Sequence, residues 1–250
     1  MAQFSNPMHS HQHSLEVLEL LREHDTFIES ISTMADMGCG AGLDLQWWAN
    51  LETRDEEGSV PLDITCWGVD KDISGCQIED HKRITLLNGN FEKRVLSRNV
   101  DVIWCHDAFQ YAINPLSTLK LFNEQMVTNG MLYIGMPLLS WRHLNRWHIT
   151  GSSFQFYNHT FLSMVYMLAV NGFDCKDAYF RKRENDTWLH CAVFKTDKKP
   201  MDPASTSWHD LVDLGLIHDS LASSIQINGF PRLEDALYPW LDKDLHRIAA

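Results

Sequence analysis

The segment 34–42 constrains the fold of this chain more than any other stretch of its 250 residues. It reads Met-Ala-Asp-Met-Gly-Cys-Gly-Ala-Gly, so a short apolar run ends in an acid, Asp36, and three alternating glycines, Gly38, Gly40 and Gly42. This pattern predicts a strand, a tight turn and the start of a helix. Because glycine carries no Cβ atom, a turn of this kind allows a ligand to lie against the backbone. The segment therefore predicts a nucleotide site.

The spacing of these glycines argues against a dinucleotide cofactor. A dinucleotide fingerprint has glycines at its first, third and sixth positions, with a phosphate at the helix N-terminus. In this chain the sixth position is Leu43. A nicotinamide-dependent oxidoreductase is therefore only a distant alternative.

The same residues form the pattern Asp-x-Gly-x-Gly-x-Gly, which resembles motif I of the class I S-adenosylmethionine-dependent methyltransferases. In that family the acid and the glycines hold the amino-acid and ribose portions of the cofactor. The resemblance implies S-adenosyl-L-methionine as the cofactor, with contacts from Asp36, Gly38, Cys39, Gly40 and Gly42. A glycine-rich turn between a strand and a helix, without any ligand, is the alternative interpretation.

A second acid follows the next predicted strand, which covers 64–69. Asp70, with Lys71 beside it, stands where a carboxylate accepts hydrogen bonds from both ribose hydroxyls. The separation between Asp36 and Asp70 exceeds the usual span of about 20 residues, and we attribute the excess to a charged loop over 54–61. Both residues after the strand are expected to contact the cofactor.

The third predicted strand leads to Asn90 and Phe91, where the resembling family commonly has Gly-Asp and the acid reaches the adenine amino group. The amide of Asn90 can still meet adenine, and the ring of Phe91 can lie against it. This departure from the family pattern makes the adenine contact the weakest of the implied cofactor contacts.

The segment 101–111 predicts a fourth strand and the loop at its carboxyl end. It reads Asp-Val-Ile-Trp-Cys-His-Asp-Ala-Phe-Gln-Tyr and resembles the family's Asp-Val-Ile followed by polar and aromatic residues. Ligands of open parallel sheets gather at the carboxyl ends of strands where the strand order reverses. We therefore expect His106, Asp107 and Phe109 near the sulfonium and the methyl acceptor. The alternative is that His106 only satisfies a loop carbonyl.

A long aromatic segment over 138–159 is predicted to be a lid on the acceptor side, because long loops in compact α/β domains are often binding elements. Its arginines and aromatic rings suit a planar or anionic acceptor. If the acceptor is a hydroxyl, a general base helps, and His106, His143 and His148 are the candidates. If it is an amine or a thiol, positioning alone is enough. An amphipathic helix packed on the sheet edge is the alternative for this segment.

Later segments follow the family's order of elements. The pattern predicts a helix from Pro115 through Val127, a strand over 130–137, and a terminal hairpin of strands over 175–183 and 187–195. Counting seven strands in all, we predict an α/β fold of the Rossmann-like, doubly wound type. Its sheet is mostly parallel with one antiparallel terminal strand, and helices cover both faces.

The likeness to the family spans about residues 14–196, so we place the methyltransferase domain at 1–198. A helical extension over 199–250 follows, with one helix predicted from Trp208 to Ile217 and a second near the end of the chain. Three roles are open for this extension: packing back on the domain, covering the acceptor site, or forming a homodimer contact.

The composition limits the partners and the location. A net charge of -12 disfavours nucleic acid, because binding phosphates needs clustered Lys and Arg. Six cysteines without a C-x-x-C pair indicate free thiols in a reducing cytoplasm, and no apolar stretch approaches the roughly 20 residues of a membrane span. Histidines alternate at 9, 11 and 13 without supporting ligands nearby, so we expect an entry segment there and no metal site.

These observations predict a methyltransferase that uses S-adenosyl-L-methionine and methylates an O, N or S atom of a small molecule. A macromolecular enzyme acting on protein or RNA is an alternative. The Asn/Asp-Pro motif of amino-group DNA methyltransferases is absent at the fourth strand. A second alternative, from another class, is a cofactor-binding regulatory or scaffold module without turnover.

Overall fold

The computed structural model describes residues 14–19, 21–22, 26–53, 60–76, 78, 81–137, 159–182 and 188–219. A helix covers 14–19 and 21–22. The further elements, in chain order, are η1 (Thr26–Ser30), β1 (Thr33–Met37), α2 (Leu43–Ala49), β2 (Thr65–Asp70), η2 (Ile73–Gly75), β3 (Ile84–Asn88), β4 (Val100–His106), η3 (Phe109–Tyr111), α3 (Pro115–Glu124), β5 (Met126–Pro137), α5 (Phe161–Val170), β6 (Phe173–Lys182), β7 (Trp188–Lys195) and α6 (Trp208–Asp213).

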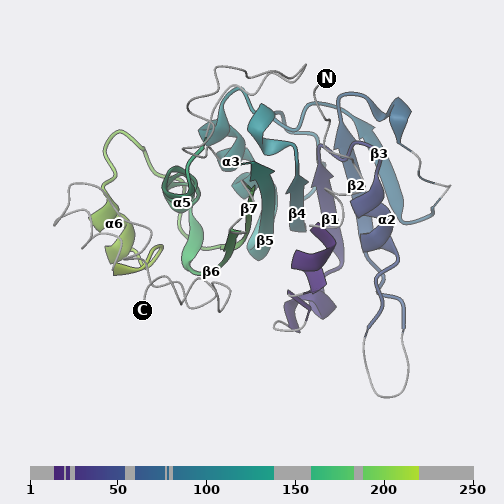
Figure 1. The fold of residues 1–250 in the computed structure, drawn as a ribbon, viewed down its shortest axis with the longest axis horizontal. Helices are drawn as coiled ribbons and strands as arrows, with labels where there is room; N and C mark the ends of the chain where they lie inside the picture. The colour runs from purple at the N-terminus through teal and green to yellow at the C-terminus, as the bar shows by residue number, and fades with distance from the viewer. Residues whose placement is uncertain are drawn as a thin grey trace.

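Seven strands form one sheet in the order β3-β2-β1-β4-β5-β7-β6 (Figure 1). The first five pair in parallel, and β7 lies antiparallel to both β5 and β6. The sheet predicted from the sequence is thereby confirmed, including its single antiparallel strand. The strand order reverses between β1 and β4, and parallel sheets bind ligands at such a switch point.

Side chains of each central strand alternate between two hydrophobic clusters, one on each face of the sheet. On β4, Val102 and Trp104 face the helix over 14–22 and α2, whereas Ile103 and Cys105 face α3 and α5. Because both faces are covered by helices, the strands read as nearly continuous apolar runs.

Three helices end earlier than the periodicity of the sequence predicts. The helix α3 ends at Glu124, and Met126 already belongs to β5, because it pairs with Val100 in the sheet. The helix α6 stops at Asp213, where Gly215 follows at φ 72° and reverses the chain. Likewise α2 ends at Ala49, although Leu51 continues the apolar spacing of its sequence. The apolar periodicity of the sequence thus extends beyond the residue at which strand pairing or a glycine turn ends the helix.

The described part of the C-terminal extension packs back on the domain. Leu211 and Leu216 are buried in the cluster around α5, and the Leu216 carbonyl accepts a 2.8 Å hydrogen bond from the Cys175 backbone. The Tyr166 hydroxyl on α5 donates to the carbonyls of Pro203 and Thr206. The domain boundary at 198 and the roles of the extension beyond residue 219 stay predictions.

Among the described residues, no helix combines the length and the apolar character that crossing a membrane would require. The predictions for the histidines at 9–13, for the lid over 138–159 apart from His159, and for the last helix of the chain lie outside the described residues.

Candidate functional site

The glycine turn joins β1 to α2 at the carboxyl end of the sheet. Gly38 and Cys39 both donate backbone hydrogen bonds to the Val69 carbonyl of β2, which fixes the turn against the neighbouring strand. Gly38 has φ 88°, and a Cβ there would collide with the Ala108 side chain. Gly42 is the N-cap of α2, with φ 80°. The turn therefore requires glycine for its own geometry.

Gly40 differs from its neighbours because no described residue fills the space beside it. It has φ 48°, and a Cβ built on it would meet no atom within 4 Å. Its backbone N–H donates a 3.0 Å hydrogen bond to Oδ2 of Asp70. An exposed, open glycine between two fixed ones allows a ligand to approach the backbone closely.

Asp36 is a buried carboxyl group for which the described residues supply no hydrogen-bond donor. Its exposed fraction is 3%, and it pairs through its backbone with Gly68 and Trp104. Burial raises its pKa well above the usual value, and the carboxylates of Asp44 and Asp70 add to the shift. A carboxylate in this environment is costly unless a cation or donor compensates it. The site therefore fits a ligand that carries a positive charge.

Asp70 closes β2 and links it to the glycine turn. Oδ2 accepts from Gly40 N–H, and Oδ1 accepts from Asp72 N–H at 3.0 Å. Because a carboxylate has about four acceptor positions, each oxygen retains capacity for a further donor. Asp70 thus has free acceptor positions for the ribose hydroxyls that the sequence assigns to it, and this contact stays a prediction; Lys71 lies exposed beside it.

Asn90 and Phe91 follow β3, which lies one strand further from the switch point than β2. The Asn90 Oδ1 atom accepts from Glu92 N–H at 2.9 Å, so this side chain also shapes its own turn. Phe91 is buried in the core, with its ring centroid 6.3 Å from that of Phe122. The core therefore covers most of the ring that the sequence assigned to adenine.

His106 and Asp107 lie together at the carboxyl end of β4, as the sequence predicts. Asp107 has φ 53°, which is uncommon for a residue other than glycine and is held by a 2.7 Å hydrogen bond from its N–H to the Gly135 carbonyl. Burial raises the pKa of its carboxyl, which accepts a 2.6 Å hydrogen bond from Gln110. Phe109 is fully buried in the core, so it supports this loop from below.

Sequence reasoning missed the partners of His106. Its Nδ1 lies 3.1 Å from the Tyr133 hydroxyl on β5, which lies 2.8 Å from Nδ1 of His190 on β7. All three side chains are buried. The one available signal is that Tyr133 and His190 carry polar atoms inside otherwise apolar strands.

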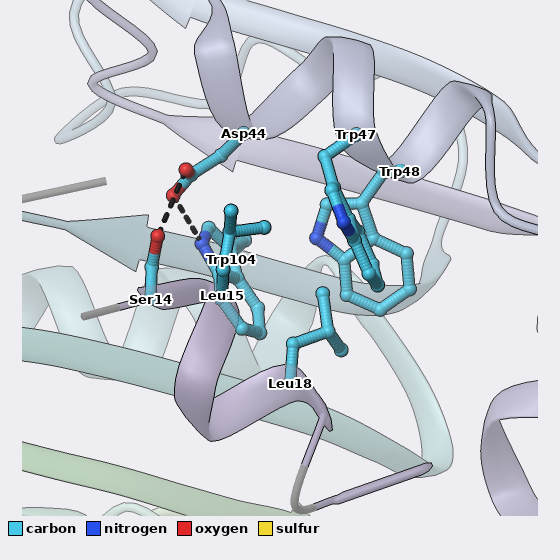
Figure 2. Close-up of a pocket in the computed structure, with 7 residues that line it drawn as sticks. All are labelled: Ser14, Leu15, Leu18, Asp44, Trp47, Trp48 and Trp104. Atoms are coloured by element: carbon cyan, nitrogen blue, oxygen red, sulfur yellow. Dashed lines mark hydrogen bonds between the residues drawn. The ribbon is translucent and has the colours of Figure 1, made fainter. Parts of the chain in front are cut away.

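Figure 2 shows a small pocket beside the start of α2, on the same face of the sheet as Trp104. Asp44 accepts hydrogen bonds from the Ser14 hydroxyl at 2.9 Å and from Trp104 Nε1 at 2.8 Å (Figure 2). The indoles of Trp48 and Trp104 meet edge to face, with centroids 5.4 Å apart. These contacts fasten the helix over 14–22 to α2 and β4. The remaining lining residues are Leu15, Leu18 and Trp47.

Two predicted site residues, His143 and His148, lie outside the described residues. Cys39 is buried in the glycine turn, and burial is the first cause of the raised pKa of its thiol, so it is a packed neutral group rather than a nucleophile. Within the described part of the chain, no three His, Cys, Asp or Glu side chains gather in a way that could hold a metal ion.

Comparisons with known proteins bear on the fold. No protein family model and no curated protein matches the chain. Magnesium protoporphyrin IX methyltransferase from Synechocystis, with bound S-adenosylhomocysteine, superposes with a TM-score of 0.55 at 13% identity, over 78% of this chain and 90% of that one. The N-methyltransferase NodS from Bradyrhizobium japonicum has a TM-score of 0.52 at 13% identity, over 77% and 99%.

An O-methyltransferase family protein from Burkholderia thailandensis gives a TM-score of 0.54 at 11% identity, over 76% of this chain and 58% of that one. The chain has the methyltransferase fold. At these identities the likeness establishes the architecture alone. In this architecture Asp36 on β1 and the glycine turn that follows it lie at the switch point, and Asp70 lies at the carboxyl end of the neighbouring strand β2.

Proposed function

We propose that this chain is an S-adenosyl-L-methionine-dependent methyltransferase that methylates an O, N or S atom of a small molecule. The observation that carries the proposal is the buried Asp36 carboxyl group, without a described donor, beside the open backbone of Gly40. S-adenosyl-L-methionine carries both an ammonium and a sulfonium, so it supplies the positive charge that this site lacks.

The residues of the turn fit the rest of such a ligand. Asp70 has acceptor capacity left for ribose hydroxyls after binding Gly40 N–H and Asp72 N–H. Gly40 leaves room for a ligand against the backbone, whereas Gly38 holds the turn against Ala108. The assignments of Cys39, Gly42, Lys71, Asn90, Phe91, His106, Asp107 and Phe109 to the same ligand are part of this proposal.

When bound, the cofactor supplies an electrophilic methyl group on sulfur. The protein then has to align a nucleophilic atom with it and exclude water. His106, at the carboxyl end of β4, is proposed to take a proton from a hydroxyl acceptor. His143 and His148 are proposed for the same role from the lid.

A small-molecule acceptor is favoured over RNA by the net charge of -12, which repels a phosphate backbone. One structure of the same fold is named for an acceptor of this kind, magnesium protoporphyrin IX. The six cysteines are all free thiols, which supports a cytoplasmic location.

The proposal is tested by incubating the protein with S-adenosylmethionine labelled in its methyl group. One set of reactions contains pools of small amines, phenols, carboxylic acids and thiols, and the others contain total RNA or unfolded protein. We expect label only in the small-molecule products. Label in RNA or protein would favour the macromolecular alternative, and cofactor binding without any labelled product would favour a module without turnover.

A further inference from the structure

Three buried polar side chains form a continuous line across β4, β5 and β7 beside the proposed acceptor site. His106 Nδ1 lies 3.1 Å from the Tyr133 hydroxyl, and this hydroxyl lies 2.8 Å from His190 Nδ1. Exposed fractions are 9%, 0% and 2% respectively. Three linked polar side chains inside an otherwise apolar part of the sheet point to a chemical role.

The hydrogen-bond pattern constrains the protonation of both imidazoles. A tyrosine hydroxyl carries one hydrogen and accepts through its oxygen lone pairs. A hydroxyl that donates to one Nδ1 atom and accepts from the other makes both contacts, and in that arrangement one histidine has Nδ1–H and the other has a bare Nδ1. When His106 is neutral and has Nδ1–H, its Nε2 carries the lone pair and is the basic nitrogen.

The surrounding rings hold the line rigidly. Tyr133 stacks on Trp104 with centroids 3.7 Å apart, and Trp188 stacks on His106 at 5.6 Å. Gly135 leaves the necessary room, because a Cβ there would lie 2.6 Å from the Tyr133 hydroxyl and collide with the His106 ring. Rotation of the tyrosine hydroxyl is thus the main freedom left in the line.

The groups around Tyr133 oppose its ionisation. Burial raises its pKa well above the usual value, and Asp44 on α2, Cys191 on β7 and Cys105 on β4 act in the same direction. Another carboxyl group, Asp107, directly follows His106 at the end of β4, and burial raises its pKa as well. A tyrosine in this setting passes protons as a neutral hydroxyl and does not store charge.

We propose that Tyr133 and His190 are positioning residues that present Nε2 of His106 as the general base and accept the proton it takes. The proposal rests on the proposed function. As the acceptor hydroxyl loses its proton to Nε2 of His106, the Nδ1 proton of His106 moves to the Tyr133 oxygen. The Tyr133 hydroxyl proton moves to Nδ1 of His190. The acceptor oxygen is left with the electron pair that bonds to the methyl group, and His190 becomes the imidazolium.

The first test needs no acceptor. In 15N-labelled protein with S-adenosylhomocysteine, long-range 15N–1H spectra above the histidine titration range report which nitrogen of each imidazole is protonated. Signals are assigned from His106→Gln and His190→Gln. We expect Nδ1–H on His106 and a bare Nδ1 on His190. Equal Nδ1 states in the two imidazoles, or the reverse arrangement, would overturn the proposal.

Tyr133→Phe removes only the hydroxyl and keeps the ring on Trp104. We expect it to change the Nδ1 state of at least one of the two histidines. The matched control is Tyr166→Phe, which removes a hydroxyl bound to the Pro203 and Thr206 carbonyls and should leave both histidines unchanged. Unchanged spectra in Tyr133→Phe would contradict the relay.

The second test uses an acceptor identified by the labelling screen. His190→Gln retains a hydrogen-bonding side chain but takes up no proton, and we expect kcat to fall about 100-fold with an altered pH profile and little change in KM. A purely structural role would leave the pH profile of the folded variant unchanged. Calorimetric titration with S-adenosylhomocysteine distinguishes failure of the proposed function from failure of the relay. If the unmodified protein does not bind this compound, the proposed function is refuted. If it binds normally but His190→Gln has an unaltered pH profile, the relay is refuted.

Discussion

Replacing Gly40 with alanine separates the space needed by the fold from the space needed by the ligand. The chain offers a matched control, because Gly40 at φ 48° and Gly215 at φ 72° both have positive φ and both have no atom within 4 Å of a built Cβ. Gly40 lies in the proposed cofactor site, whereas Gly215 follows α6. The two substitutions therefore impose the same kind of backbone strain at different places.

The magnitude of that strain follows from the left-handed backbone, which costs an L-residue about 1–2 kcal/mol. For a chain of this size each kcal/mol lowers Tm by roughly 2–4 °C. We expect Gly40→Ala and Gly215→Ala to lower Tm by similar amounts, about 2–8 °C, in thermal unfolding followed by circular dichroism. Neither new Cβ atom comes within 4 Å of an atom of the described residues.

Binding of S-adenosylhomocysteine should distinguish the two variants. The new methyl group of Gly40→Ala projects into the space where the ligand lies against the backbone, so we expect Kd to rise at least tenfold, or about 1.4 kcal/mol. Gly215→Ala should bind within about twofold of the unmodified protein by isothermal titration calorimetry. Equal affinity in the two variants, with both folded, would show that the ligand does not lie against Gly40.

Three further substitutions test the remaining contacts. Gly38→Ala should unfold at a much lower temperature, because its Cβ collides with Ala108. Adding Ala108→Gly to the same chain should recover part of the lost Tm, and no recovery would refute this steric account. Asp70→Asn should weaken S-adenosylhomocysteine binding about 10- to 100-fold. Asp72→Asn is the control, because the Asp72 side chain binds Ser74, and it should leave the affinity unchanged. Equal effects of the two substitutions would contradict the ribose assignment. The pKa of Asp36 is raised in the folded protein, so folding favours the protonated carboxyl group. Its favourable effect on the free energy of unfolding is therefore complete below the usual Asp pKa of about 4, and it is lost as the pH rises through the pKa of the folded state. Asp36→Asn should therefore be at least as stable as the unmodified protein at pH 7 in urea unfolding, yet bind the ligand poorly; lower stability with normal binding would show that Asp36 has a structural role instead.

Much of the fold was predictable from the sequence because the strands are short apolar runs bounded by glycine, proline or acidic residues. The order of helices and strands then identified the sheet, including the antiparallel β7. Boundaries were less predictable. Met126 is apolar and fits the helical stripe of α3, but its pairing with Val100 is a long-range contact that no local pattern reveals.

In the candidate site too, features set by the local sequence were predictable and features set by long-range packing were not. Gly38, Gly40 and Asp70 were recognisable because their backbone or charge requirements are local. Phe91 was assigned to adenine, but its burial against Phe122 depends on how α3 packs on the sheet.

The line from His106 through Tyr133 to His190 joins three strands that are distant in sequence. Only the sheet order, with β7 inserted beside β5, places His190 next to Tyr133.

Calorimetric titration of the purified full chain with S-adenosylmethionine, S-adenosylhomocysteine and NAD tests the central claim most directly. The account predicts that the first two bind at a single site, because both carry an ammonium group that can approach Asp36. It predicts that NAD does not bind, because the glycine spacing lacks the dinucleotide pattern. Binding of NAD, or no binding of either adenosyl compound, would contradict it.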